Sequence, residues 1–195
     1  MRKIILASGN YYHIYSRGVD RREIYSSNYH RKLFLELMRK YEVGTSGEVD
    51  VRVHVYCLMD NHFHLLVEQI SDGGVSRYMH RLLGIYVRLF NKDLGRTGRL
   101  FESEYKFVPI EGDGQFGQLI RYIHFNPVKA LLGLSGVSAK EIVKRASEWK
   151  WSNCDEYLKG RGSLQWFFDD VSYRSFLLMS IWIEREPGLK HGYLV

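Results

Sequence analysis

The chain has 195 residues, of which 45% are hydrophobic and 14% aromatic, with a formal net charge of +6. This composition predicts one globular domain with an extension and excludes a disordered polymer. Two cysteines exclude a disulfide framework and a cysteine-based zinc site, and they suit a reducing cytoplasm. No apolar run approaches the ~20 residues that a bilayer span requires, so we expect a cytoplasmic protein with no membrane partner. The modest positive charge favours a polyanionic partner without requiring one.

The first half of the chain predicts a strand, a helix and a hairpin. Residues 11–19 read as a strand, and residues 27–41 carry apolar side chains at helical spacing. After a glycine-containing break, residues 51–58 and 62–67 alternate as two strands. They follow each other closely enough to form a hairpin with residues 59–61 as its connection.

Two histidines stand at the start of the second hairpin strand. The register that keeps one hairpin face apolar pairs Val53 with Val67, Val55 with Leu65 and Cys57 with Phe63. His62 and His64 then share the opposite face, because side chains alternate along a strand. Two imidazoles on one rigid surface supply half of a metal site.

A second helix and a last strand complete the pattern. Residues 75–91 predict the helix, and residues 105–110 predict a strand in which Pro109 indicates a sheet edge. The order strand, helix, strand, strand, helix, strand fits an α+β, ferredoxin-like (RRM-like) antiparallel sheet with both helices on one face. The other face, with the two histidines, is expected to be free for a site.

A third helix, residues 115–126 with Pro127 as its stop, offers partners for the histidines. Tyr122 and Asn126 lie one turn apart on its flank, whereas His124 lies about 160° around the helix from Tyr122. We therefore expect Tyr122 and Asn126 to act together, without His124.

Four stretches of the chain resemble the motifs of a known protein family. They are Tyr-His-Ile-Tyr-Ser-Arg-Gly-Val at 12–19, Met-Asp-Asn-His-Phe-His-Leu-Leu-Val at 59–67, Phe-Asn at 90–91 with Gly-Arg-Leu-Phe at 98–101, and Tyr-Ile-His-Phe-Asn-Pro-Val-Lys-Ala at 122–130. In this order, with a later Trp151-Ser152 pair, they resemble the HUH single-tyrosine transposases, and most closely the REP-associated tyrosine transposases. The resemblance covers roughly residues 11–158.

The resemblance implies a metal-dependent single-stranded DNA endonuclease and strand transferase that forms a 5′-phosphotyrosine intermediate. Tyr122 would be the nucleophile. His62, His64 and Asn126 would bind Mg²⁺ or Mn²⁺. The implied partner is single-stranded or hairpin DNA of the REP-repeat type.

Basic side chains outside this set are candidates for DNA contact, although charged residues are ordinarily just solvated. The candidates are Arg17, Arg77, Arg81, Arg88, Arg99, Lys106 and Lys129. The remaining histidines of interest, interpreted as structural or solvent-facing, are His13, His54, His80 and His124.

Several alternatives stay open at the level of the sequence. We expect a catalytic domain over residues 1–132 and a mostly helical accessory segment over 133–195, whose role the sequence does not reveal. A non-catalytic protein that binds DNA hairpins is one rival function, and a metal-dependent RNA-processing enzyme is another. A homodimer and a monomer are both compatible with the sequence, and the target sequence is not readable from it.

Overall fold

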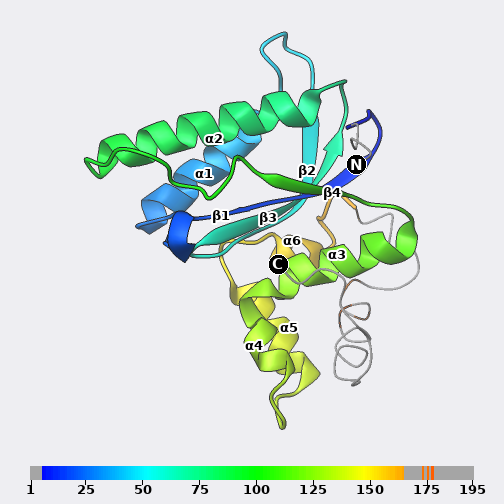
Figure 1. Cartoon of the computed structure of the whole chain (residues 1–195). Helices are drawn as coiled ribbons and strands as arrows, with labels where there is room; N and C mark the ends of the chain where they lie inside the picture. The colour runs from blue at the N-terminus through cyan, green and yellow to red at the C-terminus, as the bar shows by residue number, and fades with distance from the viewer. Residues whose placement is uncertain (1–5, 165–172, 174, 176, 178–195) are drawn as a thin grey trace.

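The computed structural model of the chain describes residues 6–164, 173, 175 and 177. Its strands are β1 (Tyr11–Arg17), β2 (Val51–Leu58), β3 (His62–Gln69) and β4 (Lys106–Pro109). They form one antiparallel sheet in the order β2-β3-β1-β4 (Figure 1). With α1 (Asn28–Lys40) after β1 and α2 (Gly74–Asp93) after β3, this is the predicted ferredoxin-like fold. Pro109 lies in an edge strand, as its missing N–H group predicts.

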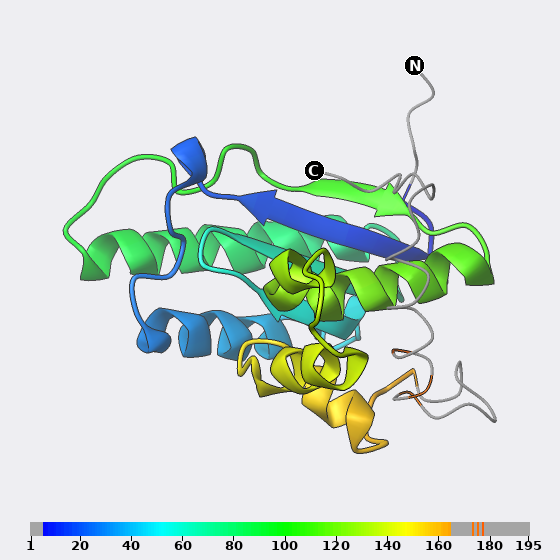
Figure 2. The same ribbon diagram turned by 90° about the horizontal axis from the view of Figure 1, so that it is seen from below.

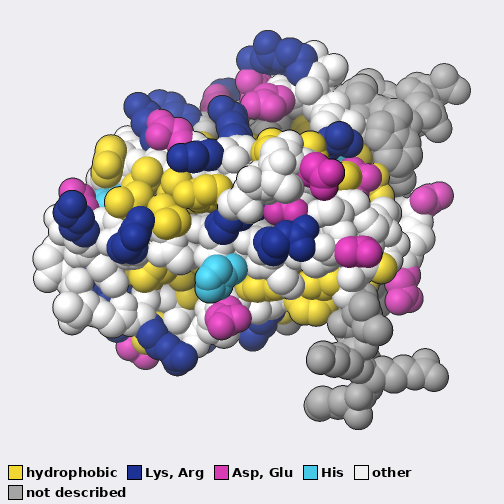
Figure 3. Space-filling view, turned by 90° about the horizontal axis from the view of Figure 1, so that it is seen from above, with side chains coloured by type: hydrophobic (Ala, Val, Ile, Leu, Met, Phe, Trp, Pro, Cys, Tyr) yellow, Lys and Arg dark blue, Asp and Glu magenta, His cyan; other side chains and the backbone are white. Residues whose placement is uncertain are grey.

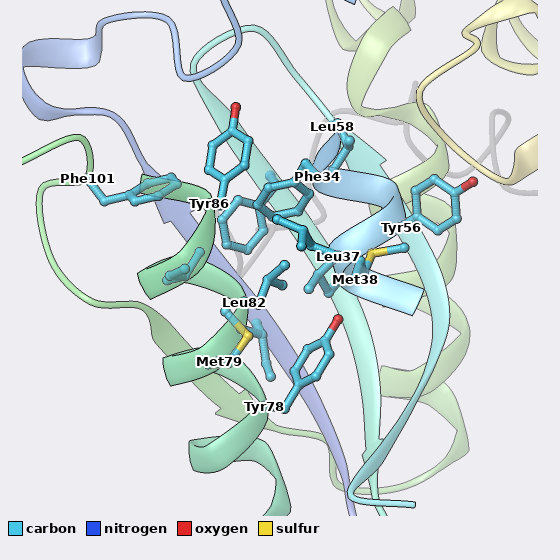
Figure 4. Close-up of a cluster of buried hydrophobic side chains, with 14 of the residues drawn as sticks. Phe34, Leu37, Met38, Tyr56, Leu58, Tyr78, Met79, Leu82, Tyr86 and Phe101 are labelled. Carbon is cyan, nitrogen blue, oxygen red and sulfur yellow. The ribbon is translucent and has the colours of Figure 1, made fainter. Parts of the chain in front are cut away.

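The first hydrophobic core lies between the sheet and the helices α1 and α2 (Figure 4). Phe34 of α1 and Leu82 and Tyr86 of α2 are fully buried there. The predicted inward residues of β3, Phe63 and Leu65, belong to this core. Strand parity therefore puts His62 and His64 on the other face, as expected.

The predicted hairpin register is right at its open end and wrong nearer the turn. Val53 pairs with Val67, but a β-bulge at His54 shifts the partners so that Val55 pairs with Leu66 and Cys57 with His64. One extra residue reverses the facing of everything beyond it. As a result Tyr56 and Leu58 enter the first core, whereas Val55 and Cys57 turn to the opposite face.

The opposite face of the sheet is covered, contrary to the prediction of a free face. Figures 1 and 2 show α3 (Asp113–Phe125) lying across it. The segments that follow α3 in the chain are η2 (Asn126–Val128), α4 (Lys129–Leu132), α5 (Ala139–Glu148) and α6 (Cys154–Leu158). Leu119, Ile120 and Ile123 of α3 form a second core with the outward residues of β2 and β3. Because α3 offers an apolar stripe, the sheet gains a second hydrophobic layer. Helix α3 ends at Phe125, close to Pro127 as predicted, and the chain continues in the short 3-10 turn η2, which begins at Asn126.

Residues after the predicted domain boundary are joined to the sheet. The Leu58 N–H donates to the Trp151 carbonyl at 2.8 Å, and the Tyr56 N–H donates to Asn153 Oδ1 at 3.0 Å. These bonds cover the outer edge of β2, which would otherwise expose unpaired backbone groups. The division at residues 132 and 133 stays a prediction, and residues 166–168 and 180–186 of the predicted extension lie outside the described residues. In the described part of the chain, no helix is long and apolar enough to cross a membrane.

Candidate active site

Helix α3 places the two predicted side chains against the two histidines of β3. The Nε2 atom of His62 lies 3.3 Å from Oδ1 of Asn126. The ring of Tyr122 stands edge-on to the ring of His64, with centroids 5.2 Å apart. The rings of His62 and His64 are 5.0 Å apart. The structure thus brings all four residues together.

The four residues line one small hollow of about 190 Å³. Its remaining walls are Tyr15, Ser16, Arg17, Phe63 and Lys129. A larger groove of about 700 Å³ lies between α2 and residues 99–105, and its lining is mainly apolar. We place the site in the smaller hollow because imidazole, amide and phenol groups converge there, and chemistry identifies a site better than size does.

Both histidines of the hollow are neutral at pH 7. Burial lowers the pKa of His64 well below its usual value, with a further contribution from the neighbouring His13. Burial also lowers the pKa of His62. Neutral imidazoles have a free lone pair, which is the form that binds a metal ion.

Tyr122 is held as a protonated phenol with a polar neighbour. Burial raises its pKa, and a hydrogen bond with the Asn126 side chain works in the opposite direction. The Nζ atom of Lys129 lies 5.4 Å from the centre of the Tyr122 ring.

His13, which the sequence predicts to be structural or solvent-facing, is a direct neighbour of the site. Its Nε2 atom lies 2.9 Å from Nδ1 of His64, and its side chain is buried. Only Nε2 of His64 is then left to face the hollow. The signal that would have found it is parity, because His13 lies on the same sheet face as His64 once β1 is placed beside β3.

The donor set fits a divalent cation. Within the described residues no group of three or more His, Cys, Asp or Glu side chains gathers as a metal site, so the two imidazoles require a ligand of another kind. The Asn126 amide oxygen, 3.3 Å from Nε2 of His62, is the candidate for this third ligand. Two nitrogen ligands and one oxygen ligand leave coordination positions open for a phosphate.

The candidate DNA contacts divide between the two sides of the sheet. Arg17 and Lys129 line the hollow, and the Nζ atom of Lys106 lies 6.0 Å from the centre of the Tyr15 ring. On α2, by contrast, Arg77 and Arg81 both form ion pairs with the buried carboxylate of Asp50, at 2.5 and 2.6 Å.

These ion pairs give Arg77 and Arg81 a structural role. Arg88 is also on α2, and Arg99 lies in the loop that faces this helix. In Figure 3, acidic side chains interrupt the basic ones on the face seen from above. The arrangement on this side does not form an unbroken basic path.

The other histidines lie outside the hollow. His124 is fully buried and bonded to Asn153, on the far side of α3 from the hollow. His54 is buried at the bulge and bonded to Glu68. His80 is exposed on α2. The helical spacing therefore separated His124 from Tyr122 and Asn126 correctly.

A comparison with protein families decides the identity of the chain. The sequence profile of the family described as "Transposase IS200 like" matches residues 7–126. The chain belongs to this family. The match includes the four residues of the hollow and ends at Asn126.

A solved structure shows the same fold. A REP-associated tyrosine transposase bound to a REP hairpin is similar to the chain with a TM-score of 0.58 and 14% sequence identity. The similarity covers 82% of this chain and 84% of that one. No curated protein sequence matches the chain. At this identity the likeness establishes the IS200-like fold but not the activity.

Proposed function

We propose that this transposase-family chain cuts and rejoins single-stranded DNA beside a hairpin, with Tyr122 as the nucleophile and a divalent cation held by His62, His64 and Asn126. The observation that supports it best is the contact of α3 with β3, where His62 Nε2 and Asn126 Oδ1 lie 3.3 Å apart beside the Tyr122 ring. A one-turn spacing lets a single helix deliver the attacking oxygen and a ligand together.

The reaction is a reversible exchange of phosphodiester bonds. The Tyr122 oxygen loses its proton and attacks the scissile phosphorus, the bond from phosphorus to the 3′ oxygen breaks, and that oxygen takes up a proton. The product is a 5′-phosphotyrosine and a free 3′-hydroxyl, and attack by a 3′-hydroxyl reverses the step. When bound, Mg²⁺ or Mn²⁺ would polarise the phosphate and neutralise its developing charge.

The chain's own groups prepare the attacking oxygen and the phosphate. The Asn126 hydrogen bond favours ionisation of Tyr122, against the effect of burial. The Lys129 ammonium lies 5.4 Å from the centre of the Tyr122 ring, where it can attract the DNA phosphate. Arg17 lies at the rim of the hollow, partly exposed and paired with Glu102 at 3.1 Å. Together with Lys106 it gives the DNA backbone a basic approach to the hollow. A hairpin substrate is proposed because a structural relative was solved with a REP hairpin.

The first prediction concerns the nucleophile. Tyr122→Phe removes the attacking oxygen but keeps the ring, so covalent attachment to a labelled hairpin with a single-stranded flank is expected to vanish. Hairpin binding is expected to stay within about twofold, since the other contacts are unchanged. The measurements are denaturing electrophoresis of the protein–DNA adduct in Mn²⁺ and a mobility shift for binding.

The matched control is Tyr11→Phe, a tyrosine on the same sheet face whose ring also packs on α3, against Phe116. It is expected to form the adduct normally. An adduct that persists in Tyr122→Phe would overturn the assignment. Binding without any adduct in the unmodified protein would instead favour the non-catalytic hairpin-binding function, and cleavage of RNA without adduct would favour RNA processing.

A further inference from the structure

The side chain of Asn61 bridges the first histidine of the site and a turn on the neighbouring segment. Its Nδ2 atom donates to the carbonyl of Arg21 at 3.1 Å. Its Oδ1 atom lies 2.6 Å from Nδ1 of His62. The bond to Arg21 fixes which end of the amide faces His62, because a carbonyl oxygen accepts only from the NH₂ end.

The orientation of Asn61 decides where the proton of His62 lies. An amide oxygen is an acceptor only, so the 2.6 Å contact requires the proton on Nδ1 of His62. A neutral imidazole carries one N–H group, and Nε2 is therefore left with its lone pair. That lone pair faces Oδ1 of Asn126 at 3.3 Å, so two acceptor atoms converge with no proton between them. Such a pair of atoms is arranged to hold a cation.

The turn that holds Asn61 is itself unusual. Asp20 and Arg21 have φ angles of 54° and 58°, in the left-handed region that non-glycine residues seldom adopt. Gly18 allows the turn to fold back, since a Cβ there would lie 2.2 Å from the carbonyl oxygen of Arg22. The result is that the Arg21 carbonyl faces Asn61 rather than solvent.

Backbone bonds attach the same turn to the start of β3. The Gly18 N–H donates to the carbonyl of Asn61 at 2.8 Å, and the Ile24 N–H donates to that of Asp60 at 2.9 Å. These two bonds hold the segment on both sides of Arg21. The partner of the Asn61 amide is thus a backbone carbonyl in a turn that two backbone hydrogen bonds hold in place.

We propose that Asn61 is a positioning residue that fixes His62 as the Nδ1–H tautomer and so keeps Nε2 available to the cation. The link from this tautomer to cation binding rests on the function proposed above, but the tautomer itself can be measured without any metal. A metal-binding histidine ordinarily donates its other N–H to an outer partner, and loss of such a partner typically weakens metal binding 10- to 100-fold. In this protein the outer partner of His62 is a neutral amide.

The experiment uses the full chain and two measurements. Long-range ¹H–¹⁵N correlation spectra of the metal-free protein report which ring nitrogen of His62 carries the proton, and calorimetric titration with Mn²⁺ reports affinity. The unmodified protein is expected to show Nδ1–H. Asn61→Ala is expected to give a mixture of tautomers and to weaken Mn²⁺ binding about 10-fold or more.

Two further variants separate this role from a general loss of stability. Asn61→Asp keeps an acceptor beside Nδ1, so it is expected to retain the tautomer and bind Mn²⁺ at least as tightly as the unmodified protein. Asn91→Ala removes a comparable bond, from Asn91 Nδ2 to the Gly98 carbonyl at 2.9 Å, and is expected to leave Mn²⁺ affinity unchanged.

The outcomes distinguish the inference from the proposed function. An Nε2–H tautomer in the unmodified protein, or equal Mn²⁺ affinities for Asn61→Ala and Asn91→Ala, would overturn the role of Asn61. An Nδ1–H tautomer that depends on Asn61, in a protein that binds no Mn²⁺, would support the positioning role and contradict the metal-dependent mechanism.

Discussion

At the scale of single residues, the hollow owes its chemistry to neutral side chains. His64 is 3% exposed, and its Nδ1 atom is engaged by His13. His62 is held in the same way by Asn61. Each histidine therefore has one nitrogen bonded to a neighbour and one nitrogen facing the hollow, which is the arrangement expected of metal ligands with outer partners.

We predict that His64→Ala removes metal-dependent cleavage. Losing one of two imidazole ligands should lower cleavage in Mn²⁺ by on the order of 100-fold or more, while hairpin binding stays close to normal. The same loss is expected when EDTA is added to the unmodified protein. Cleavage rates and mobility shifts measure the two effects, with His80→Ala, an exposed histidine of α2, as the control. Undiminished cutting in EDTA would contradict the mechanism.

At the scale of elements, α3 carries the proposed nucleophile, Tyr122, on one side and a buried anchor, His124, on the other. The Nε2 atom of His124 lies 3.0 Å from Oδ1 of Asn153, and Nδ1 of His124 is bonded to the Tyr173 hydroxyl. Asn153 also accepts from the Tyr56 N–H at 3.0 Å and donates to the His54 carbonyl at 2.8 Å. The buried side-chain amide of Asn153 therefore ties α3 to β2.

We predict that Asn153→Ala loosens this attachment. The substitution removes the Asn153 oxygen to which the Tyr56 N–H and His124 are bonded. Because both groups are buried, losing this partner should lower the free energy of unfolding by about 2–4 kcal/mol. Because α3 positions Tyr122, adduct formation should slow while hairpin binding persists.

Urea unfolding and single-turnover adduct formation measure the two effects of Asn153→Ala. The control is Asn28→Ala, an exposed position at the start of α1, which should change stability by less than about 0.5 kcal/mol. A stability loss for Asn153→Ala no larger than that of the control would refute the role of the anchor.

At the scale of the whole molecule, buried histidines couple folding to pH. Burial lowers the pKa of His124 to about 4 and that of His13 to about 3. Both groups have an ordinary pKa near 6.5, so below that pH the unfolded chain binds protons that the folded chain does not. The free energy of unfolding must therefore fall as pH is lowered from about 6.5 towards 4.

We predict that His13 and His124 together contribute a loss on the order of 4 kcal/mol between pH 7 and pH 5, from about 1.4 kcal/mol per pH unit below 6.5 for each of them. Burial also lowers the pKa of His62 and His64, so these two histidines add to the loss. Urea unfolding at a series of pH values measures it. His124→Gln removes one titrating group, so its stability should fall less steeply over the same range. If the free energy of unfolding fell equally steeply with pH in both proteins, His124 would not contribute to the pH dependence.

The sequence by itself determined the elements and the local relations within them. Strand alternation placed His62 and His64 on one face, and helical spacing joined Tyr122 to Asn126 while separating His124 from both. These relations depend only on the periods of strand and helix, which are properties of the backbone. The element order likewise predicted the ferredoxin-like sheet with β4 at its edge.

Only the tertiary structure decided what lies beside these residues. The bulge at His54 left no trace in the sequence pattern, because Tyr56 and Leu58 are as apolar as the residues they replace in the first core. The covering of the second sheet face and the pairing of His13 with His64 join residues far apart in the chain. Such contacts depend on strand register and layer packing, which no local period encodes. The sequence therefore predicted which four side chains meet in the hollow, and only the fold showed which neighbours hold them there.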